Sequence, residues 1–150
     1  MKKLFISALM CFMAFTLNAQ YVDLGLPSGT KWKSTNEEGF YTCKQAMEKF
    51  GRNIPQKNQW EELLDYCSWT WTGRGYKVIG PNNRSIFLPA AGMSYYVRNE
   101  FYGEGTCGAY YAFTANPSYG WCMGFDKDME PQMFSTDDFG KKAFSTRLVQ

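Results

Sequence analysis

Histidine is absent from this chain of 150 residues. Because histidine is the commonest general base, a frequent metal ligand and a member of many catalytic triads, its absence argues against those kinds of active site. Beyond residue 17 the sequence also has no long apolar run, no internal repeat, no linker and no low-complexity tract. We therefore expect one globular domain without catalytic activity and without a membrane-spanning helix in its body.

The beginning of the chain has the pattern of a secretory signal peptide. Lys2 and Lys3 precede an apolar run over residues 4–17, and the small Ala19 closes the segment. This order of charge, apolar core and small residue predicts export and cleavage after residue 19. A retained anchor is the alternative, although the run is shorter than the roughly 20 residues that cross a bilayer. We expect a periplasmic, cell-surface or extracellular protein with no stable membrane insertion after cleavage.

An excess of positive charge is missing from the remaining domain, residues 20–150. Two of the 16 basic side chains lie before residue 20, so 14 remain beside 14 acidic ones. Binding to nucleic acid or to an anionic membrane surface depends on neutralising phosphates with clustered lysine and arginine. We therefore expect no nucleic-acid partner.

Four cysteines follow the signal segment, at Cys43, Cys67, Cys107 and Cys122. Four cysteines allow three pairings, and the sequence does not choose among them. Cys43 and Cys67 lie on the apolar faces of expected helices, where we expect buried thiols. A bridge from Cys107 to Cys122 is the alternative, and closing that loop of about 15 residues would contribute about 3 kcal/mol.

Two amphipathic stretches predict a pair of short helices. Apolar side chains recur at spacings of three and four over residues 43–50 and again over residues 59–67, the period of a helix with one buried face. Gly51 stands where a glycine commonly ends a helix. Asn58 precedes the second stretch with Glu61 three residues later, an arrangement that predicts a capping box.

The rest of the domain alternates with the period of β-strands. A turn signal at residues 80–83 separates residues 76–79 from residues 85–88, which predicts a hairpin. Further strands are expected over residues 21–26, 30–33, 108–114, 120–125 and 143–149. Large aromatics contribute most to small cores, and we expect a mostly buried set of tryptophans at Trp32, Trp60, Trp69, Trp71 and Trp121.

Six segments, taken in order, resemble the secreted major-paralogous-domain (FISUMP-like) family of gut Bacteroidetes. They are YVDLGLPSGTKW at 21–32, IP to WEELL at 54–64, CSWTW at 67–71, GPN at 80–82, IFLPAAG at 86–92 and STRLV at 145–149. The resemblance covers nearly the whole of residues 20–150. It implies an α+β fold similar to C-type lectins, in which two helices flank small twisted antiparallel sheets. It also implies that the N-terminal and C-terminal strands pair and that a long loop region crowds one end.

Alternating acids at Asp126, Asp128 and Glu130 raise the question of calcium, which prefers several oxygen ligands. Pro131 stands where an EF-hand loop needs glycine. Lectins of the similar fold hold calcium with a Glu-Pro-Asn and a Trp-Asn-Asp triplet; residues 130–132 only imitate the first, and the second is missing. We expect a solvated acidic loop, no metal site, no cofactor and calcium-independent binding.

Tyrosines in glycine-bounded loops are the candidate binding residues. Residues 92–108 show little period, and long loops of this kind are often functional. Tyrosine on loops offers rigid contact area, although such rings also pack under their own loops. The expected ligand-binding residues are Tyr95, Tyr96, Arg98, Asn99, Tyr102 and Tyr119.

Three function classes follow from these features. We expect an exported recognition domain that binds a protein or a glycan through its aromatic loops. The alternative is a structural or assembly module of the cell envelope or surface without a soluble ligand. The third class, a cysteine-dependent oxidoreductase, requires a reactive thiol.

Overall fold

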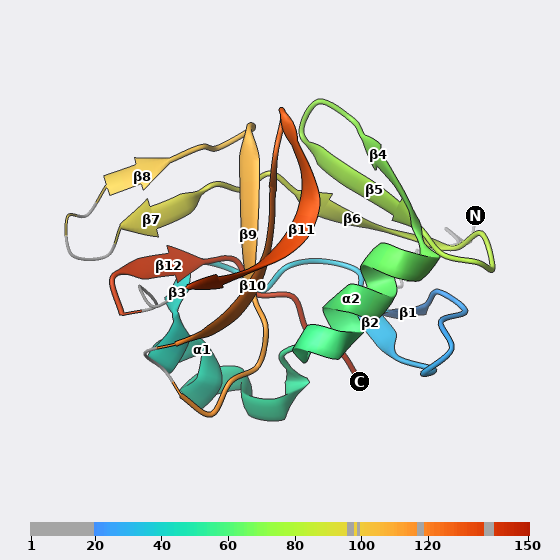
Figure 1. Ribbon diagram of the computed structural model, residues 1–150, viewed down its shortest axis with the longest axis horizontal. Coiled ribbons are helices and arrows are strands. Elements are labelled where there is room, and N and C mark those ends of the chain that lie inside the picture. The colour runs from blue at the N-terminus through green and yellow to red at the C-terminus, as the bar shows by residue number, and fades with distance from the viewer. Residues whose placement is uncertain (1–19, 96–97, 99, 117–118, 137–139) are drawn as a thin grey trace, which may run out of the picture.

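The fold combines two α-helices with several small antiparallel sheets, and it is α+β (Figure 1). The structure is a computed structural model that describes residues 20–95, 98, 100–116, 119–136 and 140–150. The expected signal segment lies outside these residues. The helices are α1 (Cys43–Phe50) and α2 (Lys57–Tyr66), with a short 3-10 helix, Gly51–Asn53, between them. No helix in the described part of the chain is both long and apolar enough to span a membrane.

The strands form four sheets. The first pairs β1 (Tyr21–Asp23) with β2 (Lys31–Lys33), and the second has the order β4 (Ser68–Trp71), β5 (Gly75–Ile79), β6 (Ser85–Pro89). The third has the order β11 (Met129–Thr136), β10 (Gly120–Asp126), β9 (Cys107–Tyr111). The fourth has the order β3 (Tyr41–Thr42), β12 (Lys142–Phe144), β7 (Met93–Tyr95), β8 (Glu100–Tyr102).

Strands β9 and β10 lie between two hydrophobic cores. Tyr110 lies opposite Met123, and both side chains belong to the core that also contains Trp32 and Trp60. One position along, Tyr111 lies opposite Cys122, and both belong to the second core. Because successive strand residues point to opposite faces, burial on both faces requires a continuous apolar run, and residues 108–112 supply one.

Each helix covers one of these cores. Helix α1 contributes Cys43 and Ala46 to the second core, and α2 contributes Trp60 and Leu63 to the first. The bounds expected for α1 are confirmed, and Gly51 ends it with a positive φ of 52°. Positive φ costs glycine little, which explains why the helix ends there.

The start of α2 corrects the expectation from the sequence. Asn58 is not the N-cap, because the helix begins at Lys57 and Gln56 precedes it as the cap. Gln56 and Gln59 form the capping box in place of Asn58 and Glu61, with the Gln56 backbone N–H donating to Gln59 Oε1 at 2.8 Å. A glutamine pair satisfies the free amides of the first turn as Asn and Glu would. It escaped detection because glutamine is not among the preferred N-cap residues.

The expected hairpin between residues 76–79 and 85–88 is confirmed. Strands β5 and β6 pair antiparallel with Val78 opposite Ile86, and both side chains are buried. The turn between them packs on the start of the domain, since a Cβ added to Gly80 would lie 2.1 Å from the Leu24 carbonyl oxygen. Only a residue without a side chain permits this approach.

Both ends of the domain meet at β2. Strand β1 pairs with one edge of β2, placing Val22 opposite Trp32. At the other edge Val149 bridges to Trp32, and Gln150 exchanges two backbone hydrogen bonds of 3.0 Å with Lys31. The C-terminal residues therefore pair with β2, and β2 separates them from β1. The expected strand over residues 143–149 is regular only as β12, after which Ser145 bridges to Tyr110.

Two further expectations are wrong. Residues 92–108 contain the hairpin of β7 and β8 where a long structureless loop was expected. The acidic segment that begins at Asp126 turns into β11, an eight-residue strand that the sequence did not predict. Of the five tryptophans expected to be mostly buried, Trp121 is 37% exposed and lies outside the core.

The positions of Cys107 and Cys122 rule out the disulfide that the sequence left open between them. Cys107 lies opposite Asp126 in the β9–β10 pair, whereas Cys122 lies opposite Tyr111, four positions along the ladder. Four positions correspond to about 13 Å, and a disulfide requires Cα atoms within about 7 Å. All four cysteines of the described residues are free; Cys43 and Cys122 are buried, and Cys67 and Cys107 are half-buried.

Candidate functional site

The β7–β8 hairpin holds most of the sequence-predicted binding residues that the structure describes. It lies at one end of the molecule, with β1, β2 and the C-terminus towards the other end (Figure 1). Strand β8 is an edge strand, and all three of its residues are exposed. Tyr96 and Asn99, which were also predicted to bind ligand, lie outside the described residues.

One face of this hairpin carries two stacked tyrosine rings with two cationic side chains beside them. The Tyr95 and Tyr102 rings stack with centroids 5.9 Å apart and planes inclined by 29°. The Arg98 guanidinium lies 5.8 Å from the centroid of the Tyr95 ring, and the Lys142 ammonium lies 5.5 Å from it. Tyr95 is therefore partly used in packing, whereas Tyr102 remains 40% exposed.

The opposite face carries Phe101, which sequence reasoning missed. Phe101 is 48% exposed and touches Phe40 edge-on, with ring centroids 5.0 Å apart. Phe40 in turn lines a shallow hollow of about 440 Å³ with Tyr41, Gln45, Glu48 and Lys49. The alternation of β8 explains this arrangement, because Phe101 and Tyr102 must point to opposite faces. A sequence prediction of residues 100–102 as a strand would have placed Phe101 on this exposed face.

Tyr119 is not part of this cluster. It lies in the connection from β9 to β10, which passes below α1 in Figure 1, away from β7 and β8. Its backbone N–H reaches the Asn116 carbonyl at 3.4 Å, and its own carbonyl accepts from the Thr114 hydroxyl at 3.2 Å. The Tyr119 side chain is 50% exposed. The structure thus brings Tyr95, Arg98 and Tyr102 together and leaves Tyr119 apart.

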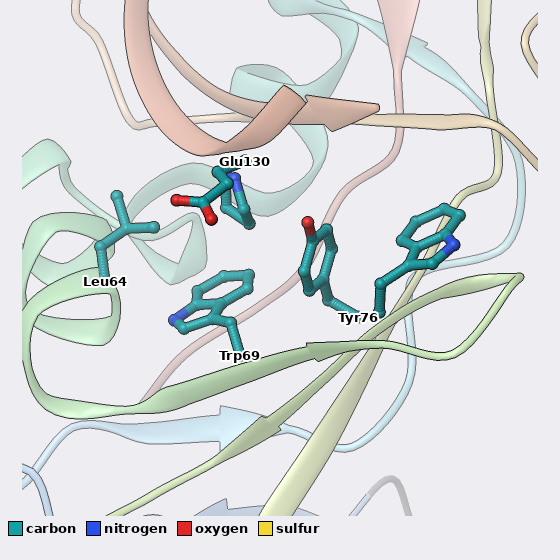
Figure 2. A pocket seen from close by; sticks show the side chains of 6 residues that line it. Leu64, Trp69, Tyr76 and Glu130 are labelled. Atoms are coloured by element: carbon teal, nitrogen blue, oxygen red, sulfur yellow. The ribbon is translucent and has the colours of Figure 1, made fainter. Parts of the chain in front are cut away.

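A second candidate site is an aromatic cleft of about 420 Å³. Helix α2, strands β4 and β5 and strand β11 surround it (Figure 2). Its lining consists of Leu64, Trp69, Trp71, Tyr76, Glu130 and Pro131. Trp69 and Trp71 were expected in the mostly buried set of tryptophans, but they are only half-buried and line the cleft.

The pairing of β4 with β5 sets the positions of the aromatic rings. Trp71 lies opposite Tyr76, and Trp69 lies two residues away on the same face. The Tyr76 ring is inclined by 68° to Trp69 and by 65° to Trp71, with centroids 5.8 and 5.3 Å apart. The Trp69 indole N–H donates to the Leu63 carbonyl at 3.1 Å, which fixes the first ring against α2.

A β-bulge brings Glu130 to the cleft. The register of β10 with β11 shifts between Gly124 and Asp126, so Glu130 and Pro131 together face the single residue Phe125. A bulge of this kind bends the strand and redirects its side chains. Proline is tolerated there because β11 is an edge strand and the bulge leaves a position without a ladder hydrogen bond. In Figure 2 the Glu130 carboxylate and the Tyr76 hydroxyl both point into the space above Trp69.

The cleft has a negative electrostatic character. Burial raises the pKa of Tyr76, and the nearby carboxylates of Glu130 and Asp126 raise it further. Tyr76 therefore stays protonated at neutral pH and offers its hydroxyl as a hydrogen-bond group. Among the described residues, no hydrogen bond or ion pair joins the Glu130 carboxylate to another side chain.

The three acids of the expected acidic loop do not converge. Asp126 Oδ1 accepts the backbone N–H of Asp128 at 2.7 Å, the Asp128 carboxylate pairs with Lys127, and Glu130 faces the aromatic cleft. Within the described ranges no three His, Cys, Asp or Glu side chains gather where they could hold a metal ion.

The thiols do not resemble activated nucleophiles. Burial raises the pKa of Cys43 to about 11, and burial together with Glu62 raises that of Cys67 to about 11. Burial also raises the pKa of Cys107 and of Cys122. A reactive cysteine requires the opposite shift, towards the thiolate.

Comparison of the chain with protein-family models, with curated proteins and with solved structures finds no match in any of the three.

Proposed function

We propose that this chain is an exported, non-catalytic recognition domain with a C-type-lectin-like fold, which binds a protein or a glycan without calcium. The binding surface is the β7–β8 hairpin, with Tyr95, Tyr102 and Phe101 as its aromatic contacts. The signal-like segment over residues 1–19 supports export. The convergence of the C-terminal residues on β2, the two helices and the small sheets support the lectin-like fold.

The exposure of both faces of β8 is the observation that carries this proposal. Phe101 and Tyr102 project to opposite sides of one edge strand and are 48% and 40% exposed. Exposed aromatic side chains that occur singly need no explanation, but adjacent ones on a protruding element are typical of binding surfaces. Arg98 adds an exposed cation beside Tyr95, and arginine is enriched at binding surfaces with tyrosine.

A glycan array probed with the purified protein, with calcium and with a chelator, tests the proposal. Replacing both Tyr95 and Tyr102 by alanine should lower the signal of any bound glycan at least about ten-fold, because two aromatic contacts are lost. The melting temperature should change by only a few degrees, since the pair lies outside both cores.

Phe87→Ala is the matched control, because Phe87 is also 40% exposed but lies on β6, outside the hairpin. It should leave the array signal unchanged. A large loss of stability in the tyrosine variant with unchanged binding would instead assign both rings to packing of the hairpin.

One feature favours the alternative, an assembly module of the envelope or surface. Edge strands offer free backbone groups to which a second chain can pair, and β8 is such a strand. Light scattering of the purified protein separates the two functions. A monomer supports recognition, whereas a stable self-assembled particle supports the assembly module.

A further inference from the structure

The aromatic cleft between α2, β4, β5 and β11 lies apart from the hairpin and has its own chemistry (Figures 1 and 2). Three aromatic rings and one carboxylate surround it, and the remaining lining, Leu64 and Pro131, is apolar. The faces of aromatic rings carry negative potential. A cleft with aromatic faces and a carboxylate is therefore matched to a positively charged guest.

The orientation of the rings decides between two kinds of guest. A neutral sugar ring stacks on a flat platform and requires several hydrogen-bond groups around its rim. Here the ring planes of Trp69 and Trp71 are inclined by 68° and 65° to that of Tyr76. The centroids of both tryptophan rings lie within 5.8 Å of the Tyr76 centroid, so the three rings pack edge to face and offer no flat platform for a sugar ring. The exposed parts of the two indoles are suited instead to a cation, which binds over the face of a tryptophan ring.

The position of Glu130 supplies the second argument. The bulge at residues 130–131 turns this carboxylate towards the rings, and no cationic side chain among the described residues pairs with it. The nearby Lys127 pairs with Asp128 instead. An exposed carboxylate at the edge of the cleft can pair with a cationic guest, and hydrogen bonds between charged groups are stronger than those between neutral ones.

We propose that this cleft binds an organic ammonium group against the half-buried indole rings of Trp69 and Trp71, with the Glu130 carboxylate as its counter-charge. The methyl or methylene groups next to the nitrogen contact Leu64 and Pro131. The proposal does not rest on the function proposed for the hairpin, because the residues of the two sites do not overlap.

Paired probes that differ only in charge test the cleft. Choline and its neutral carbon isostere 3,3-dimethyl-1-butanol form one pair, and glucosamine and glucose form the other. Titrations of the purified protein are followed by the indole N–H signals of the tryptophans in two-dimensional NMR. We expect choline or glucosamine to shift the signals of Trp69 and Trp71 and to bind at least about ten-fold more tightly than its neutral partner, the size expected for a desolvated cation–π contact with a counter-charge. Stronger binding of choline would identify a quaternary headgroup, and stronger binding of glucosamine would identify an amino sugar.

Two matched amide variants identify the counter-charge. Glu130→Gln should weaken cation binding by about ten-fold, because it removes the charge and keeps the shape. Asp128→Asn removes the same charge two residues away, where the side chain is exposed and already paired with Lys127, and should change binding less than about two-fold. Because both positions are exposed, neither change should lower the melting temperature by more than a few degrees.

Equal affinity for each charged probe and its neutral partner would overturn the proposal. So would equal losses in the two amide variants, since the carboxylate would then have no specific role. Loss of glycan binding in the tyrosine variant of the hairpin has no bearing on either result, and the two proposals therefore fail separately.

Discussion

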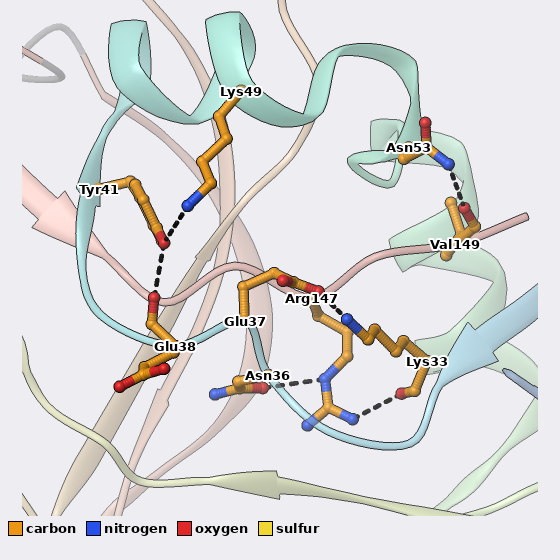
Figure 3. A network of polar contacts seen from close by, with 9 residues as sticks. All are labelled: Lys33, Asn36, Glu37, Glu38, Tyr41, Lys49, Asn53, Arg147 and Val149. Carbon is orange, nitrogen blue, oxygen red and sulfur yellow. Dashed lines mark hydrogen bonds and ion pairs between the residues drawn. The ribbon is translucent and has the colours of Figure 1, made fainter. Parts of the chain in front are cut away.

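Arg147 is buried among the C-terminal residues, with an exposed fraction of only 1%. Its Nε donates to Asn36 Oδ1 at 2.9 Å, and Nη1 donates to the Lys33 carbonyl at 2.7 Å (Figure 3). Its Nη2 donates to the Phe87 carbonyl at 2.5 Å. Burial lowers the pKa of the guanidinium, and Tyr110 and Glu37 oppose that shift. The fork of donors thus links the end of the chain to β2 and β6.

Arg147→Lys should destabilise the protein by about 2–4 kcal/mol. A lysine ammonium cannot reach three acceptors in different directions, so buried carbonyl groups and Asn36 would lose their partners. Urea unfolding followed by tryptophan fluorescence measures the loss. Arg84→Lys, at an exposed arginine, is the control and should change stability by less than about 0.5 kcal/mol. Equal stability of the two variants would show that the fork contributes nothing beyond its charge.

The buried thiols predict a dependence of stability on alkaline pH. In the folded protein the pKa of Cys43 and of Cys67 rises from 9.0 to about 11, with burial as the main cause. Because the folded-state pKa is raised, the thiols lose their protons at a lower pH in the unfolded chain than in the folded protein. The stabilisation that the buried, protonated thiols contribute is therefore complete below pH 9 and declines as the pH rises towards 11. Stability in urea should therefore fall between pH 9 and pH 11.

A variant with alanine at both Cys43 and Cys67 should lose less stability over the same pH interval, although it starts less stable because a buried side chain is shortened. Identical pH slopes for the two proteins would contradict the assignment. Alkylation by iodoacetamide gives an independent check. At pH 8 the folded protein should react much more slowly than the urea-unfolded protein, because thiolates are scarce and Cys43 is covered.

At the scale of the elements, two substitutions at the start of α2 test whether Gln59 or Asn58 caps the helix. Gln59 Oε1 accepts the Gln56 backbone N–H at 2.8 Å, and Gln59 Nε2 donates to the Thr30 hydroxyl at 3.1 Å. Gln59→Ala should therefore cost about 1–2 kcal/mol in urea unfolding. Asn58 is exposed, and Asn58→Ala should change stability by less than about 0.5 kcal/mol. A larger loss of stability in Asn58→Ala than in Gln59→Ala would show that Asn58 caps the helix, as the sequence predicted.

Elements with a clear period could be predicted, and elements set by tertiary contacts could not. The bounds of α1 and the β5–β6 hairpin followed from helical spacing and from a strong turn signal. Strand β11 was hidden because Pro131 and the alternating acids are typical of a loop. Only its place at a sheet edge, with a bulge at that proline, makes the strand possible.

The candidate sites were recognised to different extents for similar reasons. Tyr95, Arg98 and Tyr102 were predicted from their place in a glycine-bounded segment rich in tyrosine, a composition typical of binding loops. The aromatic cleft was missed, since it requires Glu130 beside rings from strands about 60 residues earlier in the chain. Contacts of that separation leave no local pattern in a sequence.

At the scale of the whole molecule, closure at β2 connects the chain ends to both cores. Leu148 is 8% exposed and packs in the second core, whereas Val149 is 4% exposed and packs in the first. Backbone bonds join Lys33 to Leu148, Asn53 to Val149 and Lys31 to Gln150. The last residues therefore tie β2 to the 3-10 helix and fill a position in each core.

Removing residues 148–150 should leave the protein largely unfolded at room temperature. Two buried aliphatic side chains contribute about 1.5–3 kcal/mol each, and the lost backbone bonds leave buried groups without partners. Together these losses approach the 5–15 kcal/mol that typically holds a domain of this size folded. Near-ultraviolet circular dichroism and the fluorescence of the buried Trp32 would report the loss. Removal of Gln150 alone is the control, because that residue is exposed and gives up only its two backbone bonds with Lys31. Native spectra and a native melting temperature after removal of residues 148–150 would show that the domain folds without closure at β2.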